Sequence, residues 1–235
     1  MKGADIYNLD GVEDVVRLEE VAAKIKRAVV LGGGVIGLQA AQMFHNRGVE
    51  VAVIESGQRV LRGVCDAQGA ELAARRMREA GVIIRCGAEV KDIIRDKEGG
   101  LRGVLLKDKS FLEAGAVAVS GSEDNPALSM VSSTLFGLPL MCMGEVDPED
   151  GAPGYEACVF FDEEKQIYRK LVFKDQRLAG YVLAGDIDCA GVYTSFIKFK
   201  IEIDGRIKEK LCAGKPDVLL WPDDFFEKVW NPKNG

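Results

Sequence analysis

The chain has 235 residues, of which 47% are apolar and 29% are charged, and its formal net charge is −6 at pH 7. This balance is typical of a globular protein with a sizeable core, in one large domain or two small ones. The acidic chain has no Lys/Arg block, no run of about 18 apolar residues and no signal-peptide segment, so we expect a cytoplasmic protein without nucleic-acid or membrane contacts.

The first half of the chain alternates strand-like and helical patterns. Residues 12–25 carry apolar residues at helical spacing, and a βαβαβ unit begins at residue 27. The period then changes to two on either side of a KEGG turn at 97–100, which indicates an antiparallel insert. We expect residues 111–122 to form one returning strand. The predicted fold class is α/β, with a Rossmann-like domain that carries an antiparallel insert.

The second half of the chain follows a different order. A polar joint with a proline, SEDNPALSM at 122–130, precedes four strand-like runs, a helical stretch and a short helix closed by glycine. This order predicts a small α+β domain with an antiparallel sheet packed against one helix. Six aromatic residues are expected in its core or on its sheet faces: Tyr168, Phe173, Tyr181, Tyr193, Phe196 and Phe199.

A glycine-rich loop lies between the first strand and the first helix of the βαβαβ unit. Gly32, Gly34 and Gly37 fit the pattern G-x-G-x-x-G, with Gly33 as an additional glycine. In this setting the first glycine permits a tight turn, the second lets the backbone approach a pyrophosphate, and the third lets the helix pack closely on the strand. The helix N-terminus offers N–H groups and a positive dipole end to the phosphates. A glycine turn in an unrelated βα unit is the alternative.

Glu55 closes the second strand, about 20 residues after the motif, where dinucleotide-binding folds place an acid. Its carboxylate would accept hydrogen bonds from the adenosine ribose and repel a 2′-phosphate, which favours NAD over NADP. Arg59 and Arg62 lie close by in the sequence and weaken this preference. The residues predicted to bind the cofactor are Gly32, Gly33, Gly34, Val35, Ile36, Gly37, Gln39, Glu55, Ser56 and Arg62.

Neither the cysteines nor the histidine indicates a metal or redox centre. The six cysteines are scattered without a C-x-x-C pair, so we expect them to be reduced, in a reducing compartment. They are Cys65, Cys86, Cys142, Cys158, Cys189 and Cys212. His45 is the only histidine and is predicted to be structural. Asp186 and Asp188 are interpreted as a turn with an acid at a helix N-cap rather than as a cation site.

The stretch RAVVLGGGVIGLQAAQMFHNRGVEVAVIE is similar to the NAD-binding domain of the FAD-dependent pyridine nucleotide-disulfide oxidoreductases. The similarity continues through RVLRGVCD and GVIIRCGAEVKDI, and the first 25 residues resemble the connector before that domain. YRKLVFKDQRLAGYVLAGDIDCAGVYTSFIK resembles the C-terminal domain of the NADH:rubredoxin reductase and nitrite reductase branch. The predicted divisions are a connector helix at 1–26, an NAD-binding domain at 27–121, a C-terminal α+β domain at 131–213 and a tail at 214–235.

The sequence departs from this family pattern in the segments that bind the flavin. The family binds FAD between two segments, one before the NAD-binding domain and one after it, and we expect both to be absent here. AVAVSGS is followed closely by LSMVSSTLFGLPLMCMGE, which resembles the start of the C-terminal domain. The pair Gly185-Asp186 belongs to the C-terminal resemblance and does not indicate a flavin site.

A second departure concerns the nicotinamide end. The family keeps a glutamate two residues after the third glycine, where it helps to position the nicotinamide, and this chain has Gln39. A glutamine still hydrogen-bonds a carboxamide but brings no charge. A simple helix residue is an equally good interpretation of Gln39.

The resemblance implies hydride transfer from NADH to flavin, but without FAD segments the hydride has no acceptor in the chain. We therefore expect the NAD(H)-binding part of such an oxidoreductase, inactive alone and without catalytic or metal-binding residues of its own. An enzyme completed by a flavin-bearing or redox partner protein, and a non-enzymatic NAD(H)-responsive regulatory or assembly module, are the alternatives. The resemblance also implies a homodimer formed through the C-terminal domain.

Overall fold

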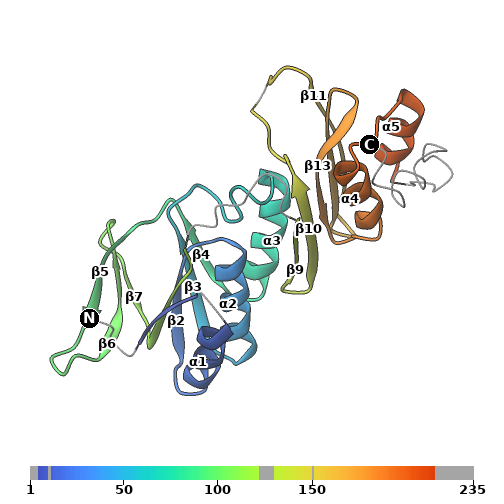
Figure 1. Ribbon diagram of the computed structural model, residues 1–235. Helices are drawn as coiled ribbons and strands as arrows, with labels where there is room; N and C mark the ends of the chain where they lie inside the picture. Colours follow the sequence, from blue (N-terminus) through green and yellow to red (C-terminus); the bar gives the residue numbers. More distant parts are fainter. Residues whose placement is uncertain (1–4, 10–11, 122–129, 150, 215–235) are drawn as a thin grey trace. The chain divides into compact units, whose positions relative to one another are not determined.

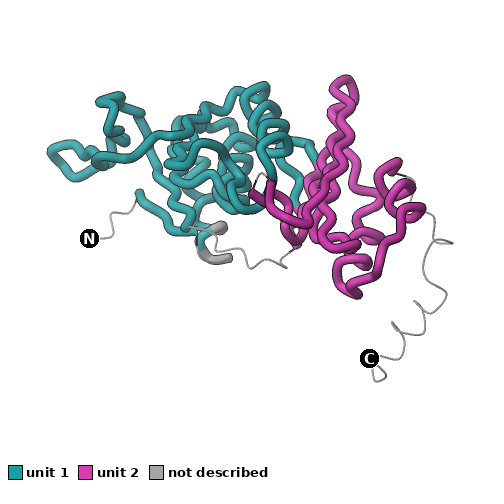
Figure 2. The backbone as a smooth tube through the Cα atoms, turned by 90° about the horizontal axis from the view of Figure 1, so that it is seen from above, with its two compact units in different colours: residues 1–125, 133–138 teal, residues 126–132, 139–235 magenta. Residues whose placement is uncertain are grey.

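The computed structural model describes residues 5–9, 12–121, 130–149 and 151–214. The chain divides into two compact units, which Figure 2 shows in different colours. Unit 1 comprises residues 1–125 and 133–138, and unit 2 comprises residues 126–132 and 139–235. The predicted joint at 122–130 and the predicted tail lie almost entirely outside the described residues, so these boundaries stay predictions.

Unit 1 is built on a five-stranded parallel sheet in the order β1-β8-β2-β3-β4 (Figure 1). A three-stranded antiparallel sheet, β5-β6-β7, is inserted between β4 and β8. The elements are β1 (Ile6–Asn8), α1 (Val12–Ala22), β2 (Arg27–Leu31), α2 (Val35–Asn46), β3 (Glu50–Glu55), α3 (Ala67–Glu79), β4 (Ile83–Cys86), β5 (Val90–Arg95), β6 (Leu101–Leu106), β7 (Phe111–Glu113) and β8 (Ala116–Val119). The predicted α/β fold with an antiparallel insert is confirmed.

The two faces of the parallel sheet are covered by different layers. Helices α2 and α3 pack on one side of it, and the antiparallel insert lies on the other (Figure 1). On the insert side, Val29 and Ile54 of the parallel sheet share a buried cluster with Val104 and Leu106 of β6. The alternation of the strand residues supplies this cluster, because every second side chain of a strand points to the same face.

The prediction of a single returning strand at 111–122 is wrong. The chain passes from β7 of the insert to β8 of the parallel sheet at Ala114 and Gly115. A Cβ atom on Gly115 would lie 2.9 Å from Cγ2 of Ile25, so the crossing passes close to that side chain. A continuous apolar run does not show where the chain passes from one sheet to the other, because a strand of either sheet can contain the same residues. The strand β1 was also not predicted, and it pairs in parallel with β8.

Unit 2 is an α+β unit, as predicted, with the sheet order β11-β12-β13-β10-β9. The sheet and its helices are β9 (Met130–Leu135), β10 (Leu138–Gly144), β11 (Tyr155–Asp162), β12 (Ile167–Lys174), β13 (Arg177–Ala184), α4 (Ala190–Lys198) and α5 (Gly205–Cys212). The end of β9 and the first residue of β10, within residues 133–138, belong to unit 1. Both helices, not one, contribute to the core of unit 2, since Tyr193 and Leu211 join Leu171 and Tyr181 in one buried cluster. The strand β9 was not predicted, because its residues MVSSTL are half polar.

Two further predictions about unit 2 need correction. Five of the six aromatic residues are buried as expected, but Phe199 is 48% exposed, because α4 ends at Lys198. Neither aspartate caps α4, whose N-cap is Cys189 without a side-chain hydrogen bond. Asp186 instead accepts a hydrogen bond from the backbone N–H of Asp188 at 3.0 Å, within the turn.

The cysteines also differ from the expectation. Cys158 in β11 and Cys212 at the end of α5 form a disulfide across 54 residues, so the expectation of six reduced cysteines is wrong for this pair. Such a pairing leaves no local spacing signal in the sequence. The other four cysteines are free thiols.

Among the described residues, no helix is long and apolar enough to cross a membrane. In the same residues, no group of three or more His, Cys, Asp or Glu side chains is arranged to hold a metal ion.

Candidate dinucleotide site

The glycine loop of unit 1 joins β2 to α2 and is tied to its neighbours by backbone contacts. The N–H of Gly32 donates to the carbonyl oxygen of Ile54 in β3 at 2.9 Å. Gly32 has a φ of +106°, and a Cβ atom there would lie 2.9 Å from the carbonyl oxygen of Ser120, which follows β8. Both the backbone conformation and the space therefore require glycine at this turn.

Gly37 lies in the first turn of α2, against the glycine loop itself. A Cβ atom on Gly37 would lie 2.2 Å from the carbonyl oxygen of Gly32, well inside van der Waals contact. The helix can therefore approach the turn this closely only with glycine at this position, which is the packing role of the third glycine in dinucleotide-binding loops.

The N-terminus of α2 is arranged to receive an anion. Its N-cap is Gly34, which has no side chain to cap the helix, and the first turn contains no acidic residue. The first N–H groups of a helix have no partner within the helix, and the helix dipole makes this end positive. Val35 is buried at this end, whereas Ile36 is 44% exposed.

The carboxylate of Glu55 is fixed against the glycine loop by two backbone N–H groups. One oxygen, Oε2, accepts a hydrogen bond from Gly33 at 2.6 Å, and the other, Oε1, accepts one from Gly57 at 2.6 Å. The hydroxyl of Ser56 lies 3.4 Å from Oε1. Each carboxylate oxygen has further lone pairs, so the group can accept additional donors without releasing the loop.

A cavity of about 350 Å³ opens beside this carboxylate. It lies at the carboxyl ends of β2, β3 and β8, the edge at which open α/β sheets bind their ligands. Its lining consists of Leu31, Gly32, Ile54, Glu55, Ser56, Ala88, Glu89, Val90, Val119 and Ser120. The size is in the range of cavities that hold small molecules. Ala88, Glu89, Val119 and Ser120 were not among the predicted site residues, because only the sheet order brings them to this edge.

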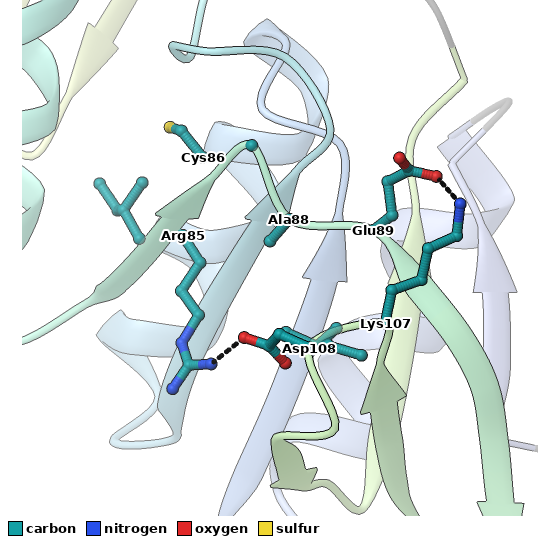
Figure 3. Close-up of a pocket in the computed structure, with 9 residues that line it drawn as sticks. Arg85, Cys86, Ala88, Glu89, Lys107 and Asp108 are labelled. Carbon is teal, nitrogen blue, oxygen red and sulfur yellow. Dashed lines mark hydrogen bonds and ion pairs between the residues drawn. The ribbon is translucent and has the colours of Figure 1, made fainter.

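A second cavity, of about 640 Å³, adjoins the first and shares Ala88 and Glu89 with it (Figure 3). The charged residues that line it form ion pairs with one another: Arg85 lies 3.9 Å from Asp108, and Lys107 pairs with Glu89. Cys86 lines the same cavity, and burial and the nearby Glu55 carboxylate raise the pKa of its thiol. A thiol with a raised pKa is a weak nucleophile near neutral pH.

The two arginines next to the site differ in their contacts. The guanidinium of Arg59 donates to the carbonyl oxygens of Cys65 at 2.6 Å and Leu61 at 3.4 Å, so it is held by the backbone. Arg62 is exposed, and its Cδ would lie 3.7 Å from a Cβ atom on Gly57. Of the two, Arg62 is the one whose side chain lies beside Gly57, the backbone donor to Glu55.

Gln39 lies on the exposed face of α2 and contacts the β9–β10 hairpin within residues 133–138, the end of β9 and the turn that follows it, which belong to the same unit. Its amide donates to the hydroxyl of Ser133 at 3.2 Å. Three residues on, the side-chain oxygen of Gln42 accepts from the N–H of Phe136 at 2.6 Å. The ring of His45 lies 5.2 Å from that of Phe136, in agreement with a structural role. No sequence pattern predicts these contacts, because the hydrogen-bonded pairs are 94 residues apart.

Sequence comparison matches residues 1–132 to the pyridine nucleotide-disulphide oxidoreductases and residues 134–201 to the rubredoxin NAD⁺ reductase C-terminal domain. The nitrite reductase (NADH) large subunit of Escherichia coli (strain K12) is 24% identical over 288 residues, which include 93% of this chain and 33% of the relative. This chain thus spans about a third of that relative's length. The alignment is longer than the 235 residues of this chain, so the relative has residues inside the aligned region that have no counterpart here.

Two solved structures resemble the chain in fold. A water-forming NADH oxidase from Lactobacillus brevis, bound to NADH, superimposes with a TM-score of 0.70 at 14% identity, over 86% of this chain and 64% of that one. Putidaredoxin reductase, in a covalent complex with putidaredoxin, gives a TM-score of 0.72 at 15% identity, over 92% of this chain and 70% of that one. At these identities the likeness shows a shared fold.

Proposed function

Since the chain belongs to the pyridine nucleotide-disulphide oxidoreductase family, whose members are NAD(P)H-dependent flavoproteins, we propose that unit 1 binds NAD(H). The pyrophosphate lies at the N-terminus of α2, and the adenosine half lies in the 350 Å³ cavity beside Glu55. When bound, NADH supplies a hydride. The residues of this chain bind and orient the dinucleotide.

The observation that carries this proposal is the shape of the glycine loop. Gly32 and Gly37 are both positions where a Cβ atom would collide with backbone oxygens, and the helix that follows begins without a cap. This arrangement leaves a backbone cradle in front of a positive helix end, which fits a pyrophosphate.

Glu55 supports a preference for NAD(H) over NADP(H). Its carboxylate lines the cavity and is held in place by Gly33 and Gly57, so a 2′-phosphate on the ribose would meet a fixed negative charge. Arg62 is the side chain available to reduce this repulsion, since Arg59 is engaged with backbone oxygens.

For FAD, the described residues do not offer a second site of this kind. The pair Gly185-Asp186 lies in the turn before α4 of unit 2, where the Asp186 carboxylate accepts from the backbone N–H of Asp188. The longer alignment of the nitrite reductase relative supports an internal segment that this chain lacks. We therefore propose that the chain takes up NAD(H) without flavin and does not turn over alone, and that a flavin-bearing or redox partner protein would accept the hydride.

A second candidate is an NAD(H)-responsive regulatory or assembly module. The contacts of Gln39 and Gln42 with the hairpin turn favour it, because a ligand at the N-terminus of α2 acts on the helix that holds this turn. For either function we propose a homodimer formed through unit 2, where Val159 and Phe160 are exposed on the edge strand β11. Sedimentation as a clean monomer at micromolar concentration would contradict the dimer.

The proposed function is tested by a spectrum and two titrations of the purified full chain. We expect no flavin absorbance, and calorimetry should give an affinity at least about tenfold higher for NADH than for NADPH. A flavin spectrum would contradict the absence of FAD and leave the NAD(H) site intact. No binding of either dinucleotide would contradict the NAD(H) site itself. NADH oxidation restored by an added partner would favour the enzyme over the regulatory module.

A further inference from the structure

The helix α5 of unit 2 has a small apolar attachment to the rest of the unit. It has eight residues, Leu211 is its one buried residue, and Ile207 packs partly buried against the same cluster. Its side-chain N-cap, Asp204, accepts from the N–H of Ile207 at 2.7 Å. A helix this short is not stable by itself in water, so its position depends on its contacts.

The polar contacts in the middle of α5 are weak. Lys208 lies 2.5 Å from a carboxylate oxygen of Glu156 in β11, but the Glu156 side chain is 73% exposed. The ammonium of Lys208 also lies 5.1 Å from the ring centre of Phe173. Exposed ion pairs contribute little to stability, so this side of α5 does not hold it firmly.

The C-terminal end of α5 is held by side chains that donate to its last carbonyl oxygens. Tyr193 donates to Leu211 at 3.3 Å, Arg169 donates to Cys212 at 3.1 Å, and the thiol of Cys189 donates to Gly214 at 3.9 Å. At this same end the Cys158–Cys212 disulfide joins the helix covalently to β11. Of all the attachments of α5 described here, the disulfide is the one that a redox reaction can remove.

The two cysteines of the disulfide lie at the margin of the unit 2 core, where they are only partly buried. Cys158 and Cys212 are both half-buried, and among the described strands β11 lies at the edge of its sheet and pairs with β12. The other thiols are less suited to exchange. Cys65 and Cys142 are buried, and burial raises the pKa of Cys86 and of Cys189, which keeps both groups as thiols at neutral pH.

We propose that Cys158 and Cys212 form a reversible thiol–disulfide site that exchanges with a low-molecular-weight thiol–disulfide couple and controls the docking of α5 on β11. In a reducing compartment, protein disulfides are typically of this transient or sensing kind. The site lies in unit 2 and is independent of the dinucleotide loop of unit 1.

The exchange proceeds in two steps. A small thiolate RS⁻ attacks one sulfur of the disulfide, forms a mixed disulfide and releases the other cysteine as a thiolate. A second RS⁻ attacks the small-molecule sulfur of that mixed disulfide, releases the remaining cysteine and leaves as RSSR. The protein disulfide gains two electrons and, on protonation, two protons, and two RSH become one RSSR. Oxidation of the protein is the reverse reaction.

The test uses the wild-type full chain in buffers with a series of reduced to oxidised glutathione ratios. Alkylation after an acid quench, followed by peptide mass spectrometry, measures the fraction of Cys158–Cys212 disulfide. We expect a two-electron transition within the range of ratios that cells maintain. Hydrogen exchange of the α5 amides, read at Lys208 and Ala213, should become at least about tenfold faster on reduction.

Two variants make the readout specific. In Cys158→Ser with Cys212→Ser, exchange in α5 should match the reduced wild type at every ratio. Cys189→Ser keeps a hydroxyl beside Gly214 and should keep the transition. Two results would overturn the proposal: a disulfide that stays intact across the whole series of ratios, or reduction that leaves the exchange of α5 unchanged.

Discussion

The glycine loop of unit 1 and the α5 attachment of unit 2 are built in opposite ways. The loop uses residues within a few positions of one another, and a Cβ atom on Gly37 would lie 2.2 Å from the carbonyl oxygen of Gly32. The α5 attachment joins residues far apart, with a disulfide that spans 54 positions. The first tolerates no added atom, whereas the second depends on one removable bond. Substitutions in the loop should therefore mainly change ligand binding, and substitutions in the α5 attachment should mainly change stability.

The largest expected effect on cofactor binding comes from Gly37→Ala in the glycine loop. The added methyl group must displace the backbone of the turn, so NADH affinity should fall by about 100-fold or more, as calorimetry would measure it. Gly191→Ala in α4 is the matched control, because nothing lies within 4 Å of its Cβ position. It should leave binding unchanged and raise helix stability by up to ~1 kcal/mol. Wild-type affinity in Gly37→Ala would show that the loop tolerates a side chain.

The largest expected effect on stability is the loss of the disulfide in the double variant Cys158→Ser with Cys212→Ser. The chain-entropy model gives about 4 kcal/mol for a closed loop of this length. Denaturant unfolding of unit 2, followed by hydrogen exchange, should show this loss against the oxidised wild type and no difference from the reduced wild type. Equal stability of the variant and the oxidised protein would mean that the other contacts of α5 are sufficient.

Glu55→Gln tests the role of charge beside the glycine loop, because it replaces the carboxylate with a neutral side chain of similar size. Only one of the two N–H bonds from Gly33 and Gly57 can remain, because the amide nitrogen of glutamine cannot accept a hydrogen bond, and the repulsion of a 2′-phosphate disappears. We expect NADH affinity to fall about tenfold and the ratio of NADPH to NADH affinity to rise. Glu71→Gln, which removes an exposed partner of Arg78 in the same unit, is the control and should change neither. An unchanged cofactor ratio would contradict the role of Glu55.

The smallest effect is expected from Tyr193→Phe in the α5 attachment. Loss of the hydroxyl that donates to Leu211 should lower the unfolding free energy of unit 2 by about 1 kcal/mol. Burial raises the pKa of Tyr193 in the folded state. The stability linked to it is therefore present below the ordinary tyrosine pKa of about 10 and is lost as the pH rises above that value. Tyr181 shows the same direction, so the measurement is the difference in alkaline stability between wild type and Tyr193→Phe.

Much of the fold was predictable because its signals are local. The strands and helices of the βαβαβ unit follow from apolar periodicity, and the turn follows from three glycines within six positions. The errors lie where one pattern fits two structures. The apolar run at 111–122 shows no sign that it divides between two sheets, and β9, a largely exposed edge strand, lacks the apolar run of the other strands.

The sequence by itself determined the class of fold, the backbone cradle of the loop and the acid at the end of β3, because each depends on residues close together in the chain. Only the tertiary structure decided that Gln39 holds Ser133, that Ser120 limits the space at Gly32, and that Cys158 pairs with Cys212. These contacts depend on strand order and on how distant segments pack. Local propensity does not specify such pairings, because the same residues could form many other pairings between distant segments.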